Sequence, residues 1–127
     1  MSDEEAIRRL MAEYCLGTDT GNTERWASCF TDDVVWDGGA FGRYEGKEAC
    51  RAFHQASGGA SSALRHLNIN PAIDVDGDRA TVQSYIIVIQ PGEGAPGVLF
   101  CGFYDDVMVK RDGRWLIQSR VLRSELA

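Results

Sequence analysis

The sequence predicts an α+β fold in which N-terminal helices pack on one face of a strongly curved antiparallel sheet. Hydrophobic residues recur at helical spacing in the first half of the chain, and alternating segments separated by tight turns fill the second half. The 127 residues, 44% of them hydrophobic, are enough for one substantial core. We therefore expect a single domain over residues 1–127, shaped as a cone-like α+β barrel around one apolar pocket.

Three helices are predicted in the first half of the chain. The first runs from residue 3 to about 20, with Ser2 or Asp3 as its cap and glycines near its end. A short second helix begins at Asn22 or Thr23, and the third lies within "EGKEACRAFHQAS". The apolar stripe of the first helix consists of Ile7, Leu10, Met11 and Tyr14.

Five strands are predicted, one before the third helix and four after it. The early strand is short, from Val34 to Trp36. Asp76-Gly77 and Asp112-Gly113 mark tight hairpin turns, which join neighbouring strands in antiparallel fashion. The four later strands run from about Arg65 to Val75, Ala80 to Gln90, Val98 to Val109 and Trp115 to Arg123.

Two strand segments, Tyr85–Ile89 and Val98–Tyr104, are apolar on both of their faces. One face of the sheet would meet the helices. The other face would be covered by a second subunit, so the sequence predicts a homodimer.

Charge and composition exclude several kinds of partner. The net charge is −6, whereas nucleic-acid binding needs a basic patch. The lysines and arginines are scattered, which disfavours an anionic membrane surface, and no apolar stretch approaches the length of a membrane span. The start Met-Ser-Asp-Glu-Glu is acidic and unlike a signal peptide, so a cytoplasmic protein is expected.

The sequence contains no recognisable metal or phosphate motif. Its four cysteines form no CxxC pair, and the two histidines are not placed to complete a zinc site, so we expect free thiols. "DVDGD" lacks the downstream glutamate of a calcium loop, and "GEGAPG" is not followed by a helix as a phosphate loop would be. His54 lies on a predicted helix beside charged and polar residues, where a solvated position is expected.

Four polar residues stand out because they can meet inside the cone. His66 and Asn68 fall on the same face of a predicted strand, and this polar face either is exposed to water or lines a cavity. Asp19 follows the apolar stripe of the first helix, which also carries Tyr14, and Arg120 lies on the last strand. Each has an ordinary structural explanation when taken alone. Together they could form one polar cluster.

The order of elements resembles the SnoaL-like group of the nuclear-transport-factor-2-like superfamily. The matching segments are "IRRLMAEYCLGTD", "CFTDDVVW", "YEGKEACRAF", "RHLNINPAIDVDGDRATVQSY", "CGFYDD" and "RDGRWLIQSR". Two members, bile acid 7α-dehydratase and hexachlorocyclohexane dehydrochlorinase, are similar in having counterparts of Asp19, His66 and Arg120, and the dehydratase also has one of Tyr14. The paired acids of steroid isomerases and the second histidine of scytalone dehydratase have no matching position here, which disfavours those two activities.

The resemblance implies a pocket in which Asp19, His66, Tyr14 and Arg120 are catalytic and no cofactor is required. An Asp–His pair is a general-base device, and Arg120 or Tyr14 could stabilise a departing anion. The substrate would be a hydrophobic ring molecule, such as a steroid, terpenoid or polyketide-like compound. Candidate substrate-binding residues are Trp26, Phe30, Trp36, Phe53, Asn68 and Phe100.

The expected function is therefore a cofactor-independent lyase or isomerase that abstracts a proton, with a dehydratase-type elimination favoured. The fold also serves other chemistries, so two alternatives stay open. One is a polyketide cyclase or epoxide hydrolase using the same pocket. The other is a ligand-binding or dimerisation module without catalysis.

Overall fold

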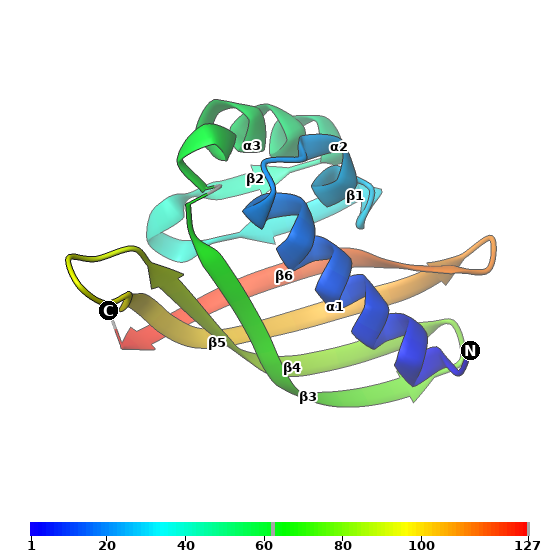
Figure 1. Cartoon of the computed structure of the whole chain (residues 1–127). Coiled ribbons are helices and arrows are strands. Elements are labelled where there is room, and N and C mark those ends of the chain that lie inside the picture. The colour runs from blue at the N-terminus through cyan, green and yellow to red at the C-terminus, as the bar shows by residue number, and fades with distance from the viewer. Residues whose placement is uncertain (62, 127) are drawn as a thin grey trace.

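The computed structural model describes residues 1–61 and 63–126, in which helices come first and a curved sheet follows (Figure 1). The expected α+β fold is confirmed. The helices are α1 (Asp3–Asp19), α2 (Thr23–Ala27) and α3 (Lys47–Ser61), with a 3-10 turn η1 (Gly39–Phe41). The strands are β1 (Phe30–Asp37), β2 (Arg43–Glu45), β3 (Arg65–Asp76), β4 (Arg79–Gln90), β5 (Gly97–Arg111) and β6 (Arg114–Leu126).

The sheet is mixed and open, with strand order β2-β1-β6-β5-β4-β3. β3 to β6 form the expected antiparallel meander, but β1 pairs with β6 in parallel. This differs from the wholly antiparallel sheet that we expected. Tight turns force antiparallel pairing only between strands adjacent in sequence, whereas α3 and four other strands separate β1 from β6.

The helices cover one face of the sheet, as Figure 1 shows. α1 crosses β3 and β6, while α3 packs on β1 and β2. A capping box starts α1, because the Ser2 hydroxyl accepts from the backbone N–H of Glu5 and the Glu5 carboxylate accepts from the backbone N–H of Ser2. The buried stripe of α1 continues past Tyr14 to Thr18, which brings the C-terminal end of the helix over the sheet.

A bulge in β3 determines which side chains reach the interior. The register shifts between Ile69 and Ala72, and Asn70 adopts a positive φ of 53°. Before the bulge, His66 and Asn68 pair with residues on the inner face of β4, whereas Leu67 and Ile69 face outward. An extra residue in a strand reverses the alternation and bends the strand, so Ile73 faces inward again after the bulge.

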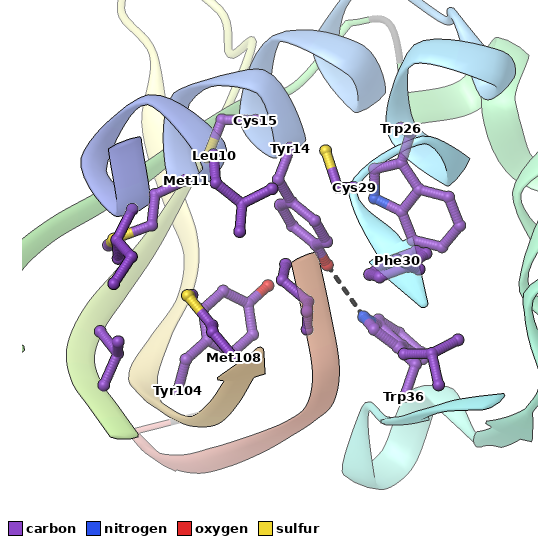
Figure 2. Close-up of a cluster of buried hydrophobic side chains, with 14 of the residues drawn as sticks. Leu10, Met11, Tyr14, Cys15, Trp26, Cys29, Phe30, Trp36, Tyr104 and Met108 are labelled. Carbon is purple, nitrogen blue, oxygen red and sulfur yellow. Dashed lines mark hydrogen bonds between the residues drawn. The ribbon is translucent and has the colours of Figure 1, made fainter. Parts of the chain in front are cut away.

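The core lies between α1, α2 and the inner face of the sheet, and much of it is aromatic (Figure 2). Gly17 of α1 allows α2 to approach closely, because a Cβ there would come within 2.7 Å of the backbone nitrogen of Trp26. This contact places the Trp26 ring against Tyr14 and Phe30.

Candidate functional site

A cavity of about 290 Å³ opens between the helices and the concave face of the sheet. Its wall is mainly aromatic and aliphatic, and its polar groups come from α1, α3, β3 and β5. The lining residues are Tyr14, Thr18, Trp26, Trp36, Phe41, Phe53, His54, Ser57, Leu64, His66, Leu99, Phe100, Tyr104 and Leu122.

Asp19 holds His66 by two hydrogen bonds. Its Oδ1 lies 2.6 Å from Nδ1 of the imidazole, and its Oδ2 accepts from the backbone N–H of His66 over 2.9 Å. Both side chains are mostly buried, with 10% of the Asp19 side chain and 15% of the His66 side chain exposed. A carboxylate at Nδ1 favours the tautomer with its proton on that nitrogen, which leaves Nε2 with a free lone pair.

Tyr14 lies on the cavity wall with its oxygen already used as an acceptor. The indole N–H of Trp36 donates to the Tyr14 hydroxyl over 2.9 Å, as Figure 2 shows. Indole nitrogen is a donor only, so the phenolic hydrogen of Tyr14 does not take part in this bond. Burial raises the pKa of Tyr14, which keeps the phenol protonated at neutral pH.

Arg120 lies beneath the cavity wall and does not line the cavity. Its side chain is fully buried, and both oxygens of Asp106 accept from it over 2.8 Å. Its Nη2 also donates to the Asn68 side chain over 3.1 Å. Burial opposes the charged guanidinium, but the charge and hydrogen bonds of Asp106 outweigh this effect and raise the pKa of Arg120.

His54 is buried against the cavity, so the expectation of a solvated His54 is wrong. Only 3% of this residue is exposed, and its ring stacks on Trp26 with centroids 4.5 Å apart. The hydroxyls of Thr23 and Thr18 bond Nδ1 and Nε2 over 2.8 and 3.1 Å. Burial, together with the neighbouring His66, lowers the pKa of His54. The sequence suggested otherwise because the helical neighbours of His54 are polar, whereas its own position falls on the inner face of α3.

Of the other candidate substrate-binding residues, some line the cavity and others are buried in the protein core. Trp26, Trp36, Phe53 and Phe100 line the cavity. Phe30 and Asn68 are not among the lining residues. Phe30 is completely buried in the core, and Asn68 bonds Ser84 and Arg120.

Sequence reasoning missed several lining residues. Tyr104 and Leu122 face inward on β5 and β6, which strand parity could have indicated. Phe41 comes from a short turn with no periodic signal, and Thr18 lies one turn beyond Tyr14 on the same helix. Asp106 was also missed, because nothing local in "FYDDV" shows which of its two acids is buried.

All four cysteines are free thiols, and three are buried. Burial raises the pKa of Cys15 and Cys50 to about 11 and that of Cys29 to about 12. Thiolate is the nucleophilic form, so these three cysteines are poorly suited to nucleophilic catalysis. Among residues 1–61 and 63–126, no group of three or more His, Cys, Asp or Glu side chains is arranged to hold a metal ion.

With this geometry established, comparison with known proteins identifies the family. The SnoaL-like domain profile matches residues 1–121. The chain belongs to the SnoaL-like family. Sequence comparison with curated proteins gives no match. Within the described part of the chain, the SnoaL-like domain has no helix with the length and apolarity needed to cross a membrane.

The similarity to solved structures covers nearly the whole SnoaL-like chain. Rv3472 from Mycobacterium tuberculosis, a protein of unknown function, is 34% identical with a TM-score of 0.88, and the match covers 97% of this chain and 72% of that one. A candidate scytalone dehydratase from Novosphingobium aromaticivorans is 28% identical with a TM-score of 0.82, covering 96% and 83%. A cystatin-like-fold protein of unknown function from Nostoc punctiforme is 25% identical with a TM-score of 0.86, covering 97% and 91%.

Proposed function

We propose that this SnoaL-like protein is a cofactor-independent lyase or isomerase in which His66, held by Asp19, removes a proton from a hydrophobic ring molecule. The observation that carries the proposal is the pair of hydrogen bonds that the Asp19 carboxylate accepts from Nδ1 and the backbone N–H of His66, a residue that lines an aromatic cavity. A binding module needs no such fixed tautomer, whereas a general base does.

The proton transfer uses Nε2 of His66. As Nε2 takes a proton from carbon, the ring becomes an imidazolium, and the Asp19 carboxylate stabilises that charge through Nδ1–H. General-base assistance of this kind contributes about 10²–10⁴-fold to a rate. Elimination of water is favoured over other outcomes, since the similar solved structures include a candidate scytalone dehydratase.

Tyr14 is proposed to assist by donating its phenolic hydrogen to a carbonyl or oxyanion of the ligand. The indole N–H of Trp36 already donates to the oxygen of Tyr14, so the hydroxyl hydrogen of Tyr14 is left for an acceptor on the ligand. A preorganised donor in a site sheltered from water is worth several kcal/mol when charge develops on the ligand oxygen.

The substrate is proposed to be a flat, largely apolar ring system bearing a carbonyl. Trp36, Phe53 and Phe100 offer aromatic walls for its body, and the same lining includes the polar groups of His66 and Tyr14. The cavity of about 290 Å³ suits two to three fused rings better than a larger ligand.

We also propose that the protein is a homodimer through the outer face of the sheet. That face carries apolar side chains with no cover from the helices, including Leu67, Ile69 and Tyr85, which are 36%, 37% and 45% exposed. Tyr85 pairs across strands with Phe103, and their ring centroids are 5.3 Å apart. Contiguous exposed apolar surface of this kind is typical of subunit interfaces.

A bicyclic β-hydroxyketone tests the proposed reaction. With 3-hydroxy-1-tetralone, His66 takes the C2 proton and the resulting imidazolium returns it to the C3 hydroxyl, which leaves as water; tautomerisation then gives 1-naphthol, which is measured by its absorbance. We expect the wild type to exceed His66→Ala by at least about 10²-fold. Exchange of the C2 protons of 1-tetralone in D₂O measures the base without a leaving group. Equal rates for wild type and His66→Ala in both assays would refute the proposal.

A further inference from the structure

Arg120 lies between two tyrosine rings, out of reach of any ligand in the cavity. Its guanidinium carbon is 4.3 Å from the centroid of the Tyr14 ring and 3.9 Å from that of Tyr104. None of its side chain is exposed, and it is not part of the cavity lining. A direct contact between Arg120 and a leaving group or carbonyl therefore has no support in this geometry.

The hydrogen bonds of Arg120 are all directed into the protein. Nε and Nη2 donate to Asp106, and Nη2 also donates to Asn68. Nη1 is buried with no hydrogen-bond partner among the described residues. Asp106 is therefore the main partner of the cation, and the two tyrosine rings are the next largest favourable contacts with it.

Both rings line the cavity, and the hydroxyl of Tyr14 is the one that Trp36 orients. Trp36 on β1 donates to its oxygen, and the Arg120 guanidinium lies against its ring. A cation at the ring favours electron withdrawal from the hydroxyl, which makes O–H a stronger donor. We infer that Arg120, held in place by Asp106, is a positioning residue that sets the strength of the hydrogen bond donated by Tyr14 to a ligand carbonyl or oxyanion. This inference rests on the proposed use of the cavity.

The electrostatics around Tyr14 agree with this geometry. The groups that act on it are Cys15 on α1, Trp36 on β1, Tyr104 on β5 and Arg120 on β6. Burial raises the pKa of Tyr14, and Arg120 is the largest influence in the opposite direction. The neighbouring thiol of Cys15 stays neutral, because burial raises its pKa to about 11. Arg120 is therefore the one full positive charge in contact with the Tyr14 ring among the described residues.

The test measures the hydrogen bond itself. The probe is 2-acetylnaphthalene, whose C=O stretching frequency falls as the hydrogen bond that it accepts becomes stronger. Naphthalene, which lacks the carbonyl, reports whether the cavity is intact. We expect a lower C=O frequency in complexes of the wild type than in those of Tyr14→Phe, with similar naphthalene affinity for both.

The decisive variant is Asp106→Asn combined with Arg120→Gln, which removes both charges and keeps polar partners in place. Neutral replacement of a whole buried ion pair is tolerated far better than loss of one partner. We expect this double variant to lose about half or more of the frequency downshift that Tyr14 produces, and to bind naphthalene as the wild type does. Asp106→Asn alone leaves Arg120 uncompensated and should increase the downshift.

These opposite signs separate an electrostatic role from a structural one, since simple loosening of the site moves both variants in one direction. The inference is overturned if the double variant lowers the C=O frequency as much as the wild type does, or if the two variants shift this frequency in the same direction. It is also overturned if Tyr14→Phe leaves the frequency unchanged. Asp19→Asn is the matched control, because it impairs the proposed base and should leave the C=O frequency unchanged. Equal exchange of the C2 protons of 1-tetralone by the wild type and His66→Ala, with an intact pattern of C=O frequencies, would refute the proposed function and leave the role of Arg120 standing.

Discussion

The indole N–H of Trp36 donates to the hydroxyl of Tyr14 over 2.9 Å and thereby joins β1 to α1 inside the core (Figure 2). The two residues are 22 positions apart in sequence. The bond uses the Tyr14 oxygen as an acceptor, which leaves the hydroxyl hydrogen of this tyrosine for another partner.

Trp36→Phe should lower both the stability of the protein and the strength of the hydrogen bond that Tyr14 donates to a ligand. The loss of this buried hydrogen bond should cost about 1–3 kcal/mol in the free energy of unfolding, measured by urea denaturation. Because Trp36 no longer orients the Tyr14 hydroxyl, the ratio of the affinities for 2-acetylnaphthalene and naphthalene should also fall. Unchanged stability and unchanged selectivity would show that the bond has no such role.

The Asp106–Arg120 pair should respond unequally to single and double substitution. Asp106→Asn alone leaves a buried charge unpaired and should destabilise the protein by about 3–5 kcal/mol. The double variant with Arg120→Gln should be clearly more stable than this single variant in urea denaturation, because no uncompensated charge remains. Additive losses from the two substitutions would contradict a coupled buried pair.

His54 should make the protein less stable in mild acid. Its pKa is lowered in the folded state, chiefly by burial, so the unfolded chain binds a proton more readily once the pH falls to about 6.5. Stability is therefore fully present above that pH and is lost as the pH falls through the folded pKa. Thermal unfolding at pH 7.5 and pH 5.5 should show a smaller difference for His54→Gln than for the wild type. Parallel losses in the two proteins would exclude this origin.

The outer sheet face should control assembly. Tyr85→Lys places a charge in the middle of the exposed apolar surface and should convert the proposed dimer to monomer in light scattering at micromolar concentration. Thr81→Lys, on the same face near the start of β4, is the matched control and should have a smaller effect. A wild-type monomer over the same concentrations would refute the proposed dimer.

The sequence predicted the fold well because its helical stripe, its hairpin turns and its alternating strands are local signals. The stripe through Ile7, Leu10 and Tyr14 is buried as expected. The β3 bulge at Asn70 was not anticipated, and it separates Ile69 from Ile73 onto opposite faces although they share sequence parity. β2 was missed because a strand of three residues carries too little pattern to recognise.

The candidate site was only partly accessible from sequence. The meeting of Asp19 and His66 was expected from the strand parity together with the resemblance to the SnoaL-like group, and they lie in hydrogen-bond contact. The positions of Arg120 and His54 depend on tertiary contacts with Tyr104, Asp106 and Trp26, which no local pattern encodes. Single buried polar side chains of this kind are decided by partners distant in the chain.

The most direct measurement of the central claim is the protonation state of the two ring nitrogens of His66 by ¹⁵N NMR. His54→Gln assigns the signals, and the pH is set where the ring is neutral. We predict that Nδ1 carries the proton and Nε2 is the free base, because the Asp19 carboxylate accepts from Nδ1. Asp19→Asn should abolish this preference. A wild-type ring with its proton on Nε2, or a tautomer unaffected by Asp19→Asn, would contradict the account of His66 as the general base.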